Sequence, residues 1–148
     1  MMVDEKDLAI LRELKSDSRR STNQIANALT IPRATVHERI KKMGQKGVIK
    51  GFTVISDYAQ LGMPVTAFIL VSFLPTSSVS QRDLANKISM LDGVFGVHLI
   101  SGEYDIMVKM RGESMESIGS LVIDEIRGME GVGGTLTCVS FSTVKDEL

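Results

Sequence analysis

The chain has 148 residues, of which 43% are hydrophobic and 24% are charged. This length suits one ordinary domain or two small ones, and this composition supports packed cores rather than disorder. No apolar run approaches the roughly 20 residues that a membrane helix needs, so we expect no membrane partner. The single cysteine, Cys138, excludes an internal disulfide and leads us to expect the reducing cytoplasm.

The two parts of the chain carry opposite charge, although the net charge is only −1. Residues 1–60 hold 11 lysines and arginines against 7 acidic residues, a balance of +4. Residues 61–148 hold 6 against 11, a balance of −5. Such an asymmetry indicates two modules with different partners. From Arg33 to Lys50 there are six cations and one anion, so the positive charge is concentrated in this segment.

The first predicted helix runs from about Asp4 to Lys15, with Asp4 as its N-cap. Residues 21–43 then predict two short helices joined by a tight turn. Ser21 and Gln24 form a capping box at the start of the first of them. The apolar face of the second is formed by Val36, Ile40 and Met43. This pattern is typical of a DNA-binding helix-turn-helix, whose second helix lies in the major groove.

Side chains outside that apolar face can meet base edges or phosphates. The candidates for reading bases are Arg33, Thr35, His37 and Arg39. The candidates for gripping phosphates are Ser21, Thr22, Lys41, Lys42 and Lys46. For each base-reading candidate, a phosphate contact or simple solvation is an equally good interpretation. Glu38 either accepts from a cytosine or orients Arg39, and we favour the second role.

The domain boundaries follow from a change of pattern after this segment. Residues 1–50 form the expected helix-turn-helix domain. Residues 51–64 form a linking strand and hinge, in which Phe52 to Ile55 predict the strand and Gly62-Met63-Pro64 breaks it. Residues 65–148 form the second domain.

The second domain alternates strands and helices. Strands are predicted at 65–74, 94–100, 104–110 and 132–144, the last with Val139 and Phe141 on one face. One helix opens at a capping box of Ser78 and Gln81, and the other spans about 113–127. The inward residues of the second helix are Met115, Ile118, Val122 and Ile126.

The resulting order is β-α-β-β-α-β, the ferredoxin-like arrangement, so the fold class is α+β. Both helices are expected on one face of an antiparallel sheet. The other face would carry residues such as Phe68 or Val97, and an uncovered apolar face needs a partner. We therefore expect a dimer in which two sheets pack together.

These features together resemble the Lrp/AsnC family of prokaryotic transcriptional regulators, also called feast/famine regulators. The motifs that carry the resemblance span the chain: Asp4 to Leu14, Ile25-Ala26, Val36 to Met43, Gly47 to Phe52, and Ser101 to Asp105 with its Gly-x-Tyr-Asp turn. The resemblance implies a winged helix-turn-helix domain followed by a C-terminal domain of the RAM/ACT-like type.

The resemblance also implies partners and a site. Family dimers form through the C-terminal domains, helped by the linking strand, and often assemble into tetramers or octamers. Effectors are usually amino acids, bound near the Gly-x-Tyr-Asp turn where dimers meet. On this chain the implied effector residues are Gly102, Glu103, Tyr104, Asp105, Thr135 and Thr137. Backbone N–H groups would hold the effector's carboxylate, and Asp105 its ammonium group. Asp105 could instead cap the hairpin turn, and Tyr104 could pack in an interface.

Two positions depart from the family pattern. Thr30 stands where the family commonly has glycine, so either the turn differs or Thr30 is strained, because a positive φ is costly for a β-branched residue. Glu103 stands where the family often has aspartate, which leaves the identity of the effector open.

Two other functions compete with DNA binding. An enzyme on the C-terminal domain would need a catalytic constellation, and the sequence offers no nucleophile beside a base and no paired carboxylates. His37 and His98 fall in different modules, so we expect no metal and no cofactor. A metabolite sensor with a disused helix-turn-helix is disfavoured by the cationic segment 33–50.

Overall fold

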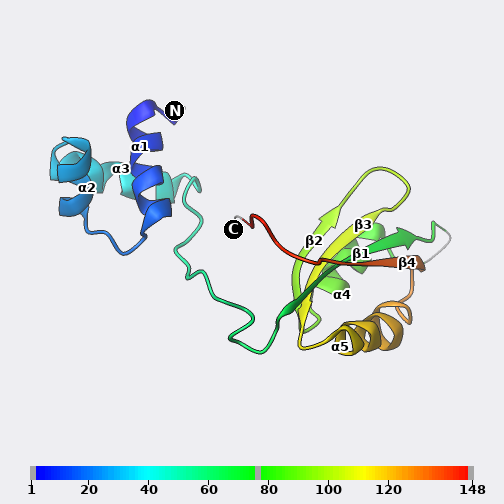
Figure 1. Ribbon diagram of the computed structural model, residues 1–148. Helices are drawn as coiled ribbons and strands as arrows, with labels where there is room; N and C mark the ends of the chain where they lie inside the picture. The colour runs from blue at the N-terminus through cyan, green and yellow to red at the C-terminus, as the bar shows by residue number, and fades with distance from the viewer. Residues whose placement is uncertain (1–2, 76–77, 147–148) are drawn as a thin grey trace. The chain divides into compact units, whose positions relative to one another are not determined.

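The computed structural model describes residues 3–75 and 78–146. The chain divides into two compact units, the first ending at Ile55 and the second beginning at Ser56 (Figure 1). Within the described residues, no helix is both long and apolar enough to cross a bilayer.

The first unit contains three α-helices: α1 (Glu5–Ser16), α2 (Thr22–Leu29) and α3 (Arg33–Gln45). Both predicted N-caps are confirmed. Asp4 accepts from the backbone N–H of Asp7 at 2.9 Å, and the Asp7 carboxylate accepts in return from Asp4. Ser21 and Gln24 form the equivalent box at α2. Local hydrogen bonds of this kind fix where α1 and α2 begin.

The core of the first unit draws on all three helices. Ile10, Ile25 and Val36, one from each helix, are completely buried. Leu14, Ala26 and Met43 complete the cluster. The apolar face predicted for α3 therefore packs into this core, and the solvent-facing side of α3 is left for other contacts.

The turn between α2 and α3 contains a strained residue. Thr30 has φ 54° and ψ 43°, the left-handed conformation, and it is the one non-glycine residue with positive φ among those described. Its neighbour Ile31 closes the turn by donating to the carbonyl of Ala26 at 3.0 Å. Of the two alternatives for Thr30, the strained one is observed.

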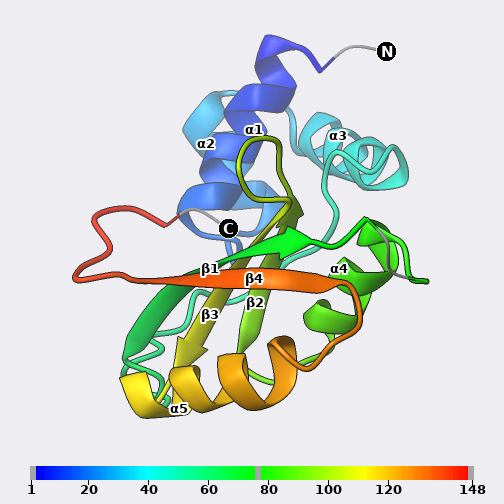
Figure 2. The same cartoon turned by 90° about the vertical axis from the view of Figure 1, so that its right-hand side faces the viewer.

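The second unit has the predicted β-α-β-β-α-β order. Its elements are β1 (Val65–Phe73), α4 (Gln81–Ser89), β2 (Val94–Leu99), β3 (Ile106–Gly112), α5 (Met115–Ser120), the π-helix η1 (Leu121–Ile126) and β4 (Val132–Val139). The strands form one antiparallel sheet in the order β2-β3-β1-β4, which leaves β2 and β4 at the edges (Figures 1 and 2).

The two faces of this sheet differ in character. Ala67, Ile69 and Val71 of β1 are completely buried, and they share a core with residues of β3, α4, α5 and η1. Residues paired across an antiparallel ladder share a face. Phe68 pairs with Lys109 and Cys138, and Leu70 pairs with Met107 and Leu136, so these residues belong to the opposite face.

Val97 lies on the other face from the one predicted. It packs against the helix-covered core, opposite Val108. The register of β2 shifts between Val94 and Gly96, and an extra residue in a strand reverses the alternation beyond it. The pattern of the sequence does not reveal this irregularity.

Several helix and strand ends also differ from prediction. The capping box of α4 uses Ser80 and Asp83, whereas the Ser78 hydroxyl donates to the Glu130 carboxylate. Met115 is the first residue of its helix, where no further turn packs beside it, and it is 64% exposed. Strand β4 ends at Val139, which pairs with Ala67 near the start of β1, so Phe141 is fully exposed beyond the ladder.

Residues 51–57 contain no strand in this single chain. A strand needs a neighbour that accepts and donates its backbone hydrogen bonds, and no described segment pairs with Phe52 to Ile55. Phe52, Val54 and Ile55 are accordingly exposed.

Candidate nucleic-acid interface and effector turn

The outer face of α3 is polar and exposed. At 100° per residue, the row farthest from Val36 and Met43 is formed by Ala34, Glu38, Lys41 and Gln45, and all four are exposed. Ala34 and Gln45 are not among the residues that the sequence predicted to bind DNA. The signal that identifies them is their spacing from the buried residues.

The structure leaves most of the predicted DNA-binding residues open to solvent. Those exposed on or just after α3 are Arg33, His37, Lys41, Lys42 and Lys46, whereas Thr35 is half-buried. At the start of α2, Thr22 is half-buried, and the Ser21 hydroxyl is already occupied by the capping box. A set of cations therefore surrounds the outer row of α3.

Arg39 is placed differently from the other predicted cations. Its Nη1 donates to Asp7 at 2.8 Å and to both carboxylate oxygens of Asp4 at 2.8 and 2.7 Å. The Asp7 side chain is only 6% exposed, so this ion pair is largely removed from water. The hydrogen bonds that Arg39 donates, to Asp7 first and to Asp4 second, raise the pKa of Arg39. Arg39 thus ties α3 to the N-terminus of α1.

Glu38 does not orient Arg39, contrary to the role that we favoured. Its carboxylate lies 3.4 Å from the Lys42 ammonium one turn along the helix. Both side chains are about half exposed, so the pair is weak and either partner can be drawn away by another charge.

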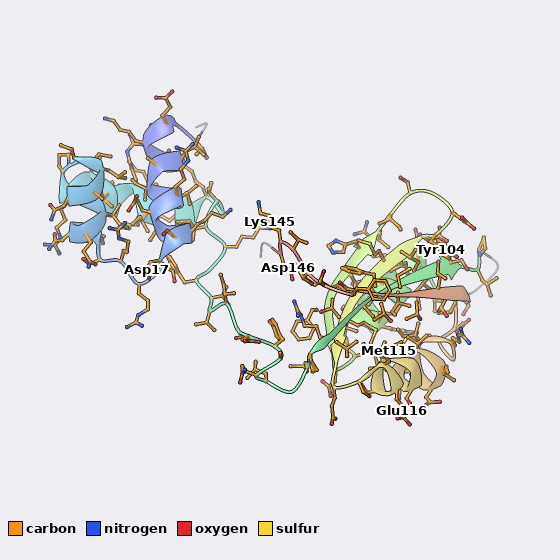
Figure 3. The ribbon with its side chains drawn as sticks, viewed as in Figure 1. Asp17, Tyr104, Met115, Glu116, Lys145 and Asp146 are labelled. Atoms are coloured by element: carbon orange, nitrogen blue, oxygen red, sulfur yellow. The ribbon has the colours of Figure 1, made fainter. Side chains whose placement is uncertain are left out.

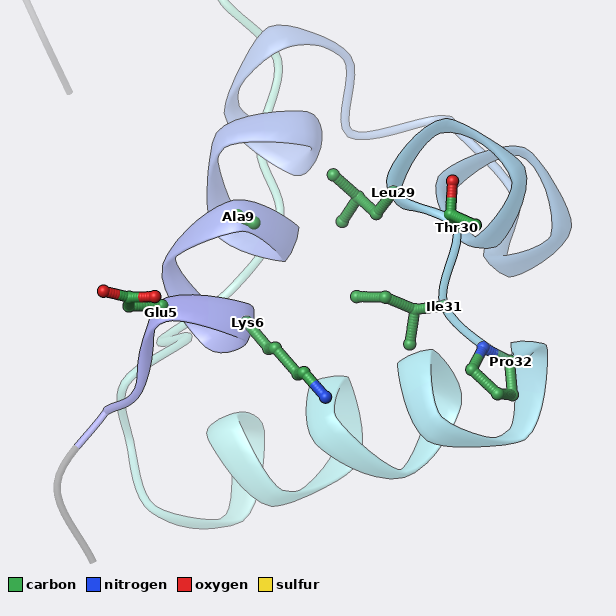
Figure 4. A pocket seen from close by; sticks show the side chains of 7 residues that line it. All are labelled: Glu5, Lys6, Ala9, Leu29, Thr30, Ile31 and Pro32. Carbon is green, nitrogen blue, oxygen red and sulfur yellow. The ribbon is translucent and has the colours of Figure 1, made fainter.

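A shallow cleft of about 340 Å³ lies between α1 and the turn that contains Thr30 (Figure 4). Its lining is formed by Glu5, Lys6, Ala9, Leu29, Thr30, Ile31 and Pro32. The strained turn is therefore solvent-accessible, and a change of side chain at Thr30 meets open space rather than the core.

In the second unit, the Gly-x-Tyr-Asp turn joins β2 to β3. Gly102 has φ 133°, a conformation that side chains of L-residues rarely adopt. Gly102 and Glu103 are exposed, whereas Tyr104 and Asp105 are half-buried. Tyr104 is labelled in Figure 3.

Asp105 fixes this turn to the end of β1. Its carboxylate accepts from the backbone N–H of Phe73 at 2.7 Å, and its own N–H donates to the carbonyl of Val71 at 3.0 Å. The side-chain amide of Gln81, at the start of α4, donates to the Asp105 carbonyl at 3.4 Å. In the single chain the Asp105 carboxylate therefore bonds to the end of β1 and not to the residues of the hairpin turn, and its role toward an effector stays a prediction.

The two threonines of β4 do not join the turn. Thr135 pairs with Val71 and Thr137 with Ile69, so both belong to the helix-covered side of an edge strand. The Thr135 hydroxyl accepts from Arg127 Nε at 2.8 Å. The structure therefore brings Gln81 to the turn, which the sequence interpretation missed, and leaves Thr135 and Thr137 apart from it.

Comparison with known proteins connects both units to one family. Residues 3–50 match the winged helix-turn-helix DNA-binding model, and residues 66–148 match the Lrp/AsnC ligand binding domain. The chain belongs to the Lrp/AsnC family. Its family relatives are transcriptional regulators rather than enzymes. This Lrp/AsnC protein is accordingly a DNA-binding transcriptional regulator with a ligand-binding domain.

Two relatives indicate how fully the likeness extends. An HTH-type transcriptional regulator of Pyrococcus horikoshii is 43% identical, over 99% of this chain and 98% of its own. The HTH-type transcriptional regulator LysM of Saccharolobus solfataricus is 36% identical, over 95% of each chain. The whole Lrp/AsnC architecture is therefore shared.

Solved structures agree with the fold. B. subtilis LrpC is 26% identical and superposes with a TM-score of 0.87 over 99% of this chain and 100% of its own. E. coli AsnC is 24% identical and superposes with a TM-score of 0.89 over 100% of this chain and 98% of its own. A Neisseria meningitidis regulator is 18% identical, and its structure is described as a complex with L-methionine. It superposes with a TM-score of 0.89 over 98% of this chain and 94% of its own.

Proposed function

We propose that this regulator binds pseudo-palindromic sites in double-stranded DNA as a homodimer that assembles further into a tetramer or octamer, and that an amino acid controls this binding. The observation that carries the proposal is the exposed outer face of α3, flanked by cations in a helix-turn-helix unit. Two-fold symmetric proteins place two such helices in successive major grooves, which explains the palindrome. We expect this activity in the cytoplasm.

The side chains divide by geometry into two roles. The outer row of Ala34, Glu38, Lys41 and Gln45 would face the base edges. The flanking groups that would contact phosphates are Ser21, Thr22, Arg33, Thr35, His37, Lys42 and Lys46. Arg39 is assigned to holding α3 in place, because its guanidinium already serves two carboxylates.

The effector would bind at the Gly-x-Tyr-Asp turn. Exposed backbone at Gly102 and Glu103 offers N–H groups for a carboxylate, and Asp105 offers negative charge for an ammonium group. A structural neighbour complexed with L-methionine supports the amino-acid class. Thr135 and Thr137 remain candidates only in an assembly that brings a second copy to this edge of the sheet.

The test is selection of genomic DNA fragments by the purified full-length protein, repeated with each amino acid. We expect enrichment of a pseudo-palindromic sequence and a change of affinity with one compound. A double variant, Lys41→Met with Lys46→Met, should lose the enrichment, whereas the matched variant Lys87→Met on α4 should retain it. Absence of any enriched site at low salt would contradict the proposal. Enrichment that no amino acid alters would contradict its effector part.

A further inference from the structure

Arg111 on β3 is the meeting point of three segments that are far apart in the sequence. Its guanidinium carbon lies 4.1 Å from the centre of the Tyr58 ring and 5.7 Å from that of the Phe95 ring on β2. Its Nη2 donates to Asp146 at 2.9 Å, and its Nη1 donates to the Thr66 hydroxyl at 3.3 Å. The Arg111 side chain is only 14% exposed.

The contact with the two rings depends on the shape of the guanidinium. Arg111 Nε is buried and has no hydrogen-bond partner among the residues that the structure describes. A planar, weakly hydrated guanidinium can lie against an aromatic face with one nitrogen unpaired, whereas an ammonium group is strongly hydrated. Tyr58 also meets Phe95 edge to face, with ring centroids 4.8 Å apart. Tyr58 is therefore held from two sides.

Tyr58 belongs to a tight turn at the start of the second unit. The Asp57 carboxylate accepts from the N–H groups of Ala59 and Gln60 at 3.0 and 3.3 Å. The N–H of Met63 donates to the Tyr58 carbonyl at 2.8 Å. Because these bonds make residues 57–63 one structural piece, fixing Tyr58 fixes the whole turn. Residues 51–55, immediately before it, contain no strand or helix.

The C-terminal segment contributes the opposite charge. Asp146, labelled in Figure 3 on the chain that follows β4, accepts from both Lys109 and Arg111. Lys109 and Arg111 are two residues apart on one strand, so they share a face. The carboxylate thus balances two neighbouring cations that would otherwise repel each other.

We propose that Arg111 is a positioning residue for regulated DNA binding. Through Tyr58 it fixes the point where the segment between the two units leaves the ligand-binding domain, and Asp146 holds its guanidinium in place. This point sets how far the chain before residue 57 can reach. The role in DNA binding rests on the proposed function, whereas the anchoring of the turn does not.

Hydrogen exchange of the full-length protein tests the anchor directly. Arg111→Met should speed the exchange of amides in residues 57–63 by roughly three- to tenfold, and Asp146→Asn by a smaller factor. Arg82→Met, which removes an exposed cation from α4, should leave the segment unchanged. Unchanged exchange at 57–63 in Arg111→Met, with β1 and β3 still protected, would overturn the proposal.

A second variant covers the case in which Arg111→Met also loosens the sheet. Tyr58→Leu removes the ring and leaves the ion pairs of β3 intact, so the faster exchange should be confined to residues 57–63. If Tyr58→Leu leaves this exchange unchanged, the ring contact does not anchor the turn and the proposal fails.

The consequence for DNA is measured on operators whose half-sites are moved apart by one or a few base pairs. The unaltered protein should discriminate among spacings, and Tyr58→Leu and Arg111→Met should discriminate less at similar best affinity. A merely structural role would weaken binding at all spacings alike, which would overturn the positioning role. Failure of the unaltered protein to bind any operator would contradict the proposed function. The hydrogen-exchange result for residues 57–63 would still test the anchoring of the turn, because it does not depend on DNA binding.

Discussion

The Arg39 guanidinium donates to the buried carboxylate of Asp7 at 2.8 Å, and this bond joins α3 to the first turn of α1. The same Asp7 completes the capping box with Asp4, so one carboxylate serves both the start of a helix and the packing of another. The cations of α3 therefore differ in role, although they look alike in sequence.

The first prediction concerns Arg39. Arg39→Met should lower the midpoint of thermal unfolding of the N-terminal unit by several degrees, because Asp7 would remain buried without its cation. Lys41→Met, on the exposed face, should change it little. Differential scanning calorimetry of both variants makes the comparison. Equal midpoints would show that the ion pair does not hold the helices together.

The second prediction concerns the salt dependence of DNA binding. Lys46→Met should reduce the slope of log affinity against log salt by about one, because this exposed lysine is proposed to neutralise one phosphate. Titrations by fluorescence anisotropy across a range of salt concentrations give the slope. Lys87→Met, on the other unit, is the control and should leave it unchanged. An unaltered slope in Lys46→Met would place this lysine outside the interface.

The third prediction concerns Thr30. Thr30→Gly should stabilise the protein by about 0.5–1 kcal/mol, since relief of the left-handed strain exceeds the entropy cost of glycine. Ala28→Gly, in the exposed part of the preceding helix, should instead destabilise by about 1 kcal/mol. Urea unfolding of the two variants measures both effects. A loss of stability in Thr30→Gly would mean that the threonine side chain makes a compensating contact.

The fourth prediction is a pH dependence. The backbone N–H of Asp7 first, and the Arg39 guanidinium second, hold the pKa of Asp4 below its ordinary value of 3.8. The stability that Asp4 contributes is therefore fully present above that value and is lost as the pH falls through the lower, folded-state pKa. Asp4→Asn keeps a capping oxygen but removes the charge. It should be less stable than the unaltered protein at neutral pH and equal to it in strong acid. A difference that persists unchanged in acid would rule out the charge as its cause.

The fifth prediction concerns the effector turn. Gly102→Ala should cost about 1–3 kcal/mol or rearrange the turn, because φ is 133° there, and amino-acid binding should weaken with it. Gly119→Ala is the matched control, since an added methyl group meets nothing within 4 Å and alanine favours helix. Isothermal titration with the effector found by selection measures the change. Full affinity in Gly102→Ala would remove the turn from the site.

Features that depend on neighbouring residues were predictable from the sequence. The capping boxes of Asp4 and Ser21, the apolar stripe of α3 and the order of strands and helices follow from spacing over a few positions. A strained Thr30 was one of the two predicted alternatives, because the turn requires a positive φ at this single position.

Features that depend on distant residues were not predictable. Arg39 pairs with carboxylates 32 and 35 positions away, and Arg111 meets Asp146 at a separation of 35. The face of Val97 depends on a register shift that no periodicity records. Ser78 and Ser80 both begin capping-box patterns, and only the folded chain decides between them.

Each unit closes a hydrophobic core of its own, and the segment before the second one contains no helix or strand. Substitutions on α3 that change the recognised DNA sequence therefore leave the packing of the second unit unchanged. Substitutions at the Gly-x-Tyr-Asp turn likewise leave the packing of the first unit unchanged. The DNA-binding unit and the ligand-binding unit of such a chain can therefore change in sequence independently of each other. A chimaera that joins the helix-turn-helix unit of one relative to the ligand-binding domain of another should fold, because each unit has its own core.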